Sequence, residues 1–478
     1  MAAPLLRQRM TATDASFLYF EKPSQPLHIG SMMALDGPLS RADLLAHMEA
    51  RIHRLPRYRQ LAAFDPLNLG HPRWEEDPAF DLGRHLEEAT LPPKAAGAAA
   101  RAALASILTP VLPRDRPLWR MTLLHGLPGG RSGVATAVHH CMVDGVSGIE
   151  LLTVITDLER DAARDEPRPF APAPAAPPLE RARDAFLDMV DLGLAAYSDA
   201  IRRAFDPDRQ MREFRAVSSA IASAAPSLLS PAPATPFNRP VGRGRSYGLI
   251  PMPFTEIRGI RSALGGTIND VVLTTLSGGL GAYLRARGQR IEGVVLRAMV
   301  PVNVRSESDK SALGNQVSML IAPLPIGIAD PASRHRQVIA GMGKLKEANM
   351  AGGFSIMSRL ADQVPPMLQA AAGAFTPDAQ PLFNLVCTNV PGPQIPLYLC
   401  GRTVEEVWPW VPLSMGLGLN VCLTSYNGVL FWGICADPAL VPDIDEVTMH
   451  LSEAFEALKS AASPPAPTNE RRLRGNRR

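Results

Sequence analysis

The stretch VHHCMVDG, residues 138–145, lies between a segment with the pattern of a strand and a segment with the spacing of a helix. It contains the adjacent pair His139 and His140, followed after three residues by Asp144 and Gly145. A histidine near its ordinary pKa accepts a proton at neutral pH, which makes it the usual general base of enzymes. Asp144 can orient an imidazole or brace the loop, and Gly145 permits a turn that a β-carbon would hinder. One interpretation of this stretch is therefore a catalytic base presented at the edge of a sheet.

Two other interpretations compete with it. A zinc site needs three or four ligands, and no third histidine or cysteine occurs at a recognisable spacing. Cys141 is inside the stretch, but neighbouring side chains on a strand point to opposite faces. We therefore predict no metal site. The remaining alternative, an ordinary polar turn with two incidental histidines, stays open at this point.

The composition predicts a soluble globular protein of two domains. A chain of 478 residues is too long for one compact core, and 46% of its residues are apolar and 20% charged. The net charge is only +3 and no long basic face precedes the tail, which argues against nucleic-acid binding. The five cysteines form no CxxC pair and the N-terminus lacks the apolar segment of a signal peptide. These features indicate reduced thiols in the cytoplasm.

One uncharged run, Val407–Ala436, has to be weighed as a membrane span. Prolines at 409 and 412 interrupt it, and Asn427-Gly428 lies between two apolar stretches. Both residues of an Asn-Gly pair tolerate positive φ, so the pair is a strong signal for a tight turn between antiparallel strands. We predict a buried β-hairpin, and at most a peripheral association with the inner membrane or with lipid inclusions.

Strands and helices alternate along both halves of the chain. This predicts an α/β protein with two sandwich domains joined by a crossover. The expected units are 1–162, a Pro/Ala-rich linker with a crossover helix at 163–240, a second half at 241–462, and a disordered basic tail at 463–478. The expected strands are 26–37, 118–126, 132–140 and 294–305, and the expected helices are 40–55, 98–112, 145–162, 179–205 and 268–288. Residues 163–178 are expected to be extended and solvated, and Ser40 is expected to open the helix at 40–55.

The motif resembles the HHxxxDG signature of the CoA-dependent acyltransferase superfamily, and the whole chain resembles the bacterial wax ester synthase/acyl-CoA:diacylglycerol acyltransferase family. The matching segments follow the order of the family over nearly the full length. They are MTATDASFLYFE (10–21), PLHIG (26–30), PLW (117–119), FNRPVG (237–242), TINDVVL (267–273), RAMVPVNVR (297–305), LGNQVS (313–318) and TNVPGP (388–393). The resemblance implies two sandwich domains like that of chloramphenicol acetyltransferase, with the active site between the halves.

The resemblance also implies a role for each residue of the motif. His140 would remove the proton from an acceptor hydroxyl, which then attacks the thioester of acyl-CoA in a ternary complex without a cofactor. His139 would shape the site. Asp144 would bond an arginine away from the substrate, with Arg297 and Arg305 as the two candidates. The implied acceptors are long-chain alcohols and diacylglycerol, and the implied products are wax esters and triacylglycerol.

Two further segments are candidates for substrate binding, each with a structural alternative. Asn269 and Asp270 precede an apolar helix, where either residue would serve as an N-cap. The resemblance implies instead that this pair is functionally sensitive, Asn269 most directly. Pro117, Leu118 and Trp119 can be packing at the start of a strand, whereas the resemblance associates them with the substrate passage.

Other functions remain open on the sequence alone. The same fold can transfer an acyl group to another alcohol or to an amine, or it can bind lipid without turnover. The basic tail can contact anionic headgroups or be a solvated end without a role.

Overall fold

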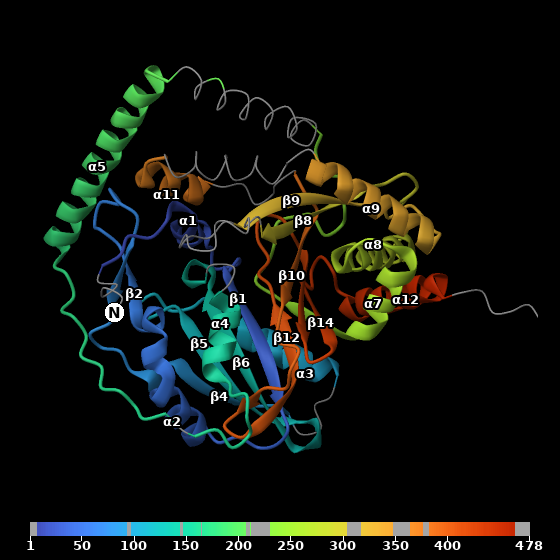
Figure 1. Cartoon of the computed structure of the whole chain (residues 1–478), viewed down its shortest axis with the longest axis horizontal. Helices are drawn as coiled ribbons and strands as arrows, with labels where there is room; N and C mark the ends of the chain where they lie inside the picture. Colours follow the sequence, from blue (N-terminus) through green and yellow to red (C-terminus); the bar gives the residue numbers. More distant parts are fainter. Residues whose placement is uncertain are drawn as a thin grey trace, which may run out of the picture.

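Two six-stranded sheets, each covered by helices, form the body of the protein (Figure 1). The mixed α/β architecture confirms the predicted fold class. The computed structural model describes residues 7–92, 97–143, 147–163, 165–206, 211, 230–303, 317–347, 364–375 and 382–463. Asp144, Gly145, Arg305 and the basic tail from residue 464 lie outside these ranges.

The first sheet has the strand order β11-β12-β1-β6-β5-β4. At its centre, β6 (Arg131–His139) is buried along nearly its whole length and pairs antiparallel with β1 (His28–Leu35) and β5 (Trp119–Leu127). β4 (Leu86–Thr90) adds to β5 in parallel. The helices of this half are α1 (Ala12–Phe20), α2 (Arg41–Arg51), α3 (Ala98–Leu108) and α4 (Ser147–Ile155). Its smaller elements are a two-stranded ribbon of β2 (Gln60–Ala63) and β3 (Arg73–Glu76), and the 3₁₀ turn η5 (His140–Met142).

The second sheet has the order β7-β14-β13-β10-β8-β9. Its strands are β7 (Ser246–Pro253), β8 (Leu296–Asn303), β9 (Val317–Leu324), β10 (Leu385–Pro391), β13 (Leu419–Tyr426) and β14 (Val429–Ala436). The helices of this half are α7 (Phe254–Leu264), α8 (Ile268–Ala286), α9 (Pro331–Glu347) and α12 (Ile444–Ala462), whereas α11 (Pro366–Phe375) packs against α1 of the first half. The predicted hairpin is confirmed: β13 and β14 pair along their full length around Asn427 and Gly428, both at positive φ.

A strand exchange joins the two halves. β11 (Tyr398–Leu399) and β12 (Arg402–Trp410) come from the second half of the sequence, but they extend the first sheet beside β1. β11 and β12 therefore belong to the second half by sequence but to the first sheet in space. From β12, Trp408 and Trp410 pack edge-on against Phe431 and Tyr247 of the second sheet, so one apolar core continues across the junction.

The linker after residue 164 has no regular secondary structure up to residue 177, as expected, but it is not freely solvated. Phe170 packs edge-on against Phe80 and lies under the guanidinium of Arg59. The N–H of Ala173 donates to the carboxylate of Glu76 at 2.7 Å, and Ala176 is buried. These contacts attach the linker to the first half before α5 (Pro178–Ala204) begins.

No helix in the described ranges is long and apolar enough to cross a membrane. All five cysteines lie in described residues and no disulfide joins them. Ser40 is the N-cap of α2 as predicted, because its side chain accepts from the N–H of Asp43.

We predict that Gly433→Ala destabilises the junction between the halves by about 1–3 kcal/mol. A β-carbon at Gly433 would lie 2.0 Å from the carbonyl oxygen of Pro409 and 2.9 Å from the Tyr247 hydroxyl, so β12 would have to move away from β14. Chemical denaturation measures the loss. Gly259→Ala in α7 is the matched control, since nothing lies within 4 Å of the added carbon there. The control should be neutral or slightly stabilising, and equal effects at the two positions would contradict the prediction.

Candidate active site

The backbone at the end of β6 is held from both sides. The N–H of His139 donates to the carbonyl of Leu118 at 2.9 Å, and the N–H of His140 donates to the carbonyl of Leu27 at 2.9 Å. The chain then turns into η5 at His140. These bonds place the histidine pair at the end of the central strand of the first sheet, as the sequence predicted.

The first histidine is fully enclosed and held in one tautomer. His139 is 1% exposed, and its Nδ1 accepts from the backbone N–H of Cys141 at 3.2 Å. Because Nδ1 is an acceptor, the ring proton is on Nε2. Nε2 lies 3.4 Å from Oε1 of Glu21. Both ring nitrogens of His139 therefore face groups of the protein, which fits a role in shaping the site.

Glu21 is a site residue that the sequence interpretation missed. Its carboxylate accepts from the N–H of Leu27 and from Arg114, each at 3.0 Å, in addition to its contact with His139. Burial alone would raise the pKa of Glu21, but His139, the Leu27 N–H and Arg114 together lower the pKa to about 2. No local sequence pattern marks Glu21 as a site residue, because only the fold brings it to His139 at the end of β6.

The second histidine has a different environment. The ring of His140 stacks on Phe17 of α1, with 4.0 Å between centroids and 10° between planes. The pKa of His140 is lowered to about 4, mainly because the ring is enclosed by the protein. The contact of the ring with its own backbone raises the pKa, and the neighbouring His139 lowers it. The Nδ1 atom is fully covered, whereas the residue as a whole is partly exposed. His140 is therefore neutral at physiological pH and able to accept a proton.

The partner of Asp144 stays a prediction, because Asp144 and Arg305 are outside the described residues. Of the two candidate arginines, Arg297 is described at the start of β8. Its guanidinium donates to the carbonyl of Ser230 at 2.7 Å, and its backbone N–H donates to the side chain of Asn384.

The start of α8 corrects the N-cap assignment. The N-cap is Thr267, and neither Asn269 nor Asp270 occupies that position. Asp270 is the third residue of the helix, where its carboxylate accepts from the N–H of Thr267 at 2.7 Å and completes a capping box. Asn269 is not used for capping, and its Oδ1 accepts from the side chain of Asn389 on β10 at 2.7 Å.

The segment Pro117–Trp119 has the contacts of a packed strand start. Leu118 and Trp119 are each 2% exposed. The indole N–H of Trp119 donates to the carbonyl of Tyr58 at 2.8 Å, and the ring stacks on His85 at 4.4 Å between centroids. These contacts account for the tryptophan by packing, and its contact with substrate stays a prediction.

Comparison with known proteins identifies the family of the chain. Residues 10–272 match the model of the wax ester synthase/diacylglycerol acyltransferase catalytic domain, and residues 313–459 match the model of the WS/DGAT C-terminal domain. The chain belongs to the wax ester synthase/diacylglycerol acyltransferase family. A putative diacylglycerol O-acyltransferase of Mycobacterium tuberculosis is 32% identical over 97% of this chain and 92% of its own length. A probable diacylglycerol O-acyltransferase of the same species is 29% identical over 97% and 98%.

Two solved structures share the fold over 95% and 97% of this chain. The wax ester synthase/diacylglycerol acyltransferase of Marinobacter aquaeolei has a TM-score of 0.65 at 23% identity, covering 95% of this chain and 100% of the other. The first condensation domain of the calcium-dependent antibiotic synthetase has a TM-score of 0.58 at 20% identity, with coverage of 97% and 98%. These likenesses show that the two halves have the condensation-domain fold.

We predict that Glu21→Gln lowers the free energy of unfolding by about 3 kcal/mol at neutral pH, the amount that a pKa fall from 4.5 to about 2 represents. Glutamine keeps the size of the side chain and removes the charge that His139 and Arg114 face. Because the pKa is lowered in the folded state, this contribution is present above about pH 4.5 and is lost as the pH falls toward 2. Urea denaturation at several pH values measures it.

Glu88→Gln is the matched control for this experiment. Glu88 is an exposed carboxylate that pairs with His125 at 3.0 Å, so its loss should cost less than about 1 kcal/mol. If the effect of Glu21→Gln were as small as that of the control, or did not shrink on acidification, the assignment of Glu21 would be wrong.

Proposed function

We propose that the protein is an acyl-CoA-dependent O-acyltransferase that makes wax esters, triacylglycerol or both. The observation that carries this proposal is His140: a neutral, partly exposed imidazole at the end of β6, stacked on Phe17, in a chain of this family. The low pKa keeps the ring unprotonated at neutral pH, which is the state that a general base requires.

In the proposed reaction His140 acts once as base and once as acid. With Nδ1 covered, Nε2 is the nitrogen available to take the proton of the acceptor hydroxyl. The acceptor oxygen then forms a bond to the thioester carbonyl carbon, and the carbon–sulfur bond breaks as the tetrahedral intermediate collapses. The proton on His140 passes to the departing CoA sulfur. The products are an ester and CoA thiol, with no acylated side chain and no cofactor.

The other members of the motif are assigned supporting roles. His139 holds the turn after β6 through its bond from the Cys141 N–H, and Glu21 holds His139 in turn. Asp144 is the brace that bonds an arginine, and Gly145 permits the following turn. His139 and Glu21 are proposed as positioning residues, because they contact each other and the backbone N–H groups of Cys141 and Leu27.

The choice of substrates follows the relatives. Two of them are named diacylglycerol O-acyltransferases, and the Marinobacter protein is named a wax ester synthase/diacylglycerol acyltransferase. A starter condensation domain with a TM-score of 0.54 was solved in complex with C8-CoA, which supports acyl-CoA as donor. Asn269, free of the capping role, and the segment Pro117–Trp119 are the proposed acceptor-side contacts.

We predict that His140→Ala leaves the protein folded and lowers the rate of acyl transfer by about 10²- to 10⁴-fold. CoA release from palmitoyl-CoA measures the rate, with dispersed hexadecanol and dioleoylglycerol as separate acceptors. The matched control is His125→Ala, at a partly exposed histidine on β5 whose Nε2 contacts Glu88.

The acceptor series also separates the alternatives. Release with hexadecylamine but with neither alcohol would indicate an amine acceptor, and no release with any acceptor would indicate a lipid-binding protein. Near-normal turnover in His140→Ala would refute the assignment of the base.

The pKa of His140 predicts the pH dependence of catalysis. The base is active when unprotonated, so with a pKa of about 4 it stays active well below the ordinary value of 6.5. We expect kcat/KM to be constant from about pH 5 to about pH 8 and to fall on the acid side with an apparent pKa near 4. Initial rates over this range, each checked by return to neutral pH, measure the profile. An acid limb centred near pH 6.5 would show that His140 is solvated like a free histidine.

A further inference from the structure

The long helix α5 turns an apolar face to solvent. Six large apolar side chains recur along it at intervals of seven, four, four, three and four residues, the spacing of one helix face. We call them the α5 stripe: Leu179, Phe186, Val190, Leu194, Tyr197 and Ile201, which are 82%, 51%, 38%, 61%, 68% and 42% exposed. In Figure 1, α5 stands at the edge of the molecule beside the first half.

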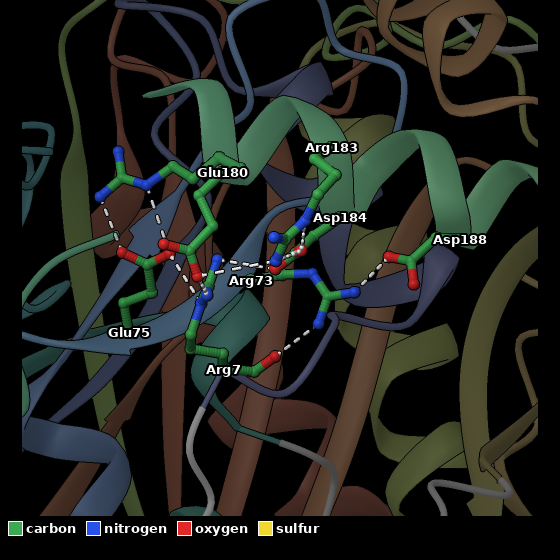
Figure 2. A network of polar contacts seen from close by, with 8 residues as sticks. Arg7, Arg73, Glu75, Glu180, Arg183, Asp184 and Asp188 are labelled. Carbon is green, nitrogen blue, oxygen red and sulfur yellow. Dashed lines mark hydrogen bonds and ion pairs between the residues drawn. The ribbon is translucent and has the colours of Figure 1, made fainter. Parts of the chain in front are cut away.

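The opposite face of α5 is charged and attached to the protein (Figure 2). Arg7 pairs with Glu180 and, at 2.8 Å, with Asp184. One turn further along, Asp188 pairs with Arg73 of β3 at 2.5 Å.

Arg181 completes the attachment. It donates to Glu75 at 2.7 Å through Nη2 and at 3.2 Å through Nε. Glu75 is only 4% exposed, so this two-point pair is shielded from solvent. The first three turns of α5 are thus fixed by their charged side.

Close packing of the backbone reinforces this orientation. Ala185, on the attached face, is buried against Gly70. A β-carbon at Gly70 would lie 3.0 Å from the β-carbon of Ala185 and 3.2 Å from its α-carbon. The helix therefore has no room to roll its apolar face inward without breaking the ion pairs. An ordinary surface helix does the reverse, burying its apolar face and exposing its charged one.

We propose that the α5 stripe docks on the surface of a phospholipid membrane. The choice of lipid rests on the proposed function, because fatty alcohols and diacylglycerol are insoluble in water and reside in lipid. At about 1.5 Å per residue, the stripe from Leu179 to Ile201 is about 33 Å long. Arg183, with a side chain 64% exposed, follows the stripe in the first turns of α5, and its guanidinium pairs with Asp184 at 2.9 Å.

The shape of the apolar face favours lipid over a second copy of the chain. A pair of helices uses a narrow seam with steps that alternate between three and four residues. Leu187 and Met189, 50% and 45% exposed, flank the stripe on its two sides. With them the apolar arc spans about 160° at 100° per residue, which is wider than the narrow a/d seam of a helix pair.

Vesicle flotation of the full-length protein tests the proposal without any use of acyl transfer. The vesicles contain phosphatidylcholine and phosphatidylglycerol. The stripe variant is Phe186→Gln, Leu194→Gln and Ile201→Gln combined, which removes apolar surface from exposed positions and keeps helix-forming residues. We expect its affinity for the vesicles to fall by about tenfold or more. Amide hydrogen exchange of the wild-type protein should slow in α5 when vesicles are added.

The matched control is Leu67→Gln, Leu158→Gln and Met449→Gln combined, at apolar residues that are 62%, 69% and 47% exposed outside α5. This control should float like the wild type. Equal flotation of the stripe variant and the wild type would overturn the proposal. The proposal would also be overturned if the substitutions only converted a dimer to a monomer. It would likewise be overturned if they only lowered the thermal stability, because the stripe would then be covered by another part of the chain. Loss of flotation with no acyl transfer in any form of the protein would instead refute the proposed function and leave the docking surface standing.

Discussion

The antiparallel pairing of β12 with β1 is the interaction on which the rest of the structure depends. β12 follows the whole of β7 to β10 in the chain, yet its backbone bonds to β1. β1 in turn bonds to β6, which ends in the histidine pair. Separating β12 would leave buried N–H and carbonyl groups of β1 without partners and expose Trp408 and Trp410. The geometry of the site therefore depends on residues more than 250 positions further along the sequence.

Two neighbouring histidines acquire different chemistry from their surroundings. His139 is enclosed between Cys141 and the ionised carboxylate of Glu21, so its ring is locked in place. His140 has an aromatic ring against one face, and its low pKa keeps it neutral. Pairs of titratable groups with divergent environments are how a site separates a structural from a catalytic role. In the proposed function His140 is the base and His139 is a positioning residue.

The sequence predicted elements well where a local pattern carries the signal. The Asn427-Gly428 turn and the Ser40 cap were both correct, because turn and cap geometry depend on the residues at the turn itself. The cap of α8 was wrong, because Thr267, Asn269 and Asp270 can each bond a nearby N–H and the sequence does not say where the helix begins. The linker was expected to be solvated, but Phe170 packs against Phe80, which lies 90 residues earlier in the sequence.

By itself the sequence determined the α/β class, the family, the position of the histidine pair at a strand end, and a helix over most of 179–205, since all of these lie in local spacing or in ordered motifs. Only the tertiary structure decided that β12 joins the first sheet, that Glu21 supports His139, and that α5 faces the protein with its charged side. Each of these depends on contacts between distant residues. The apolar spacing of α5 alone would place the stripe inward, and Arg7 and Arg73 reverse it by pairing with carboxylates on the other face.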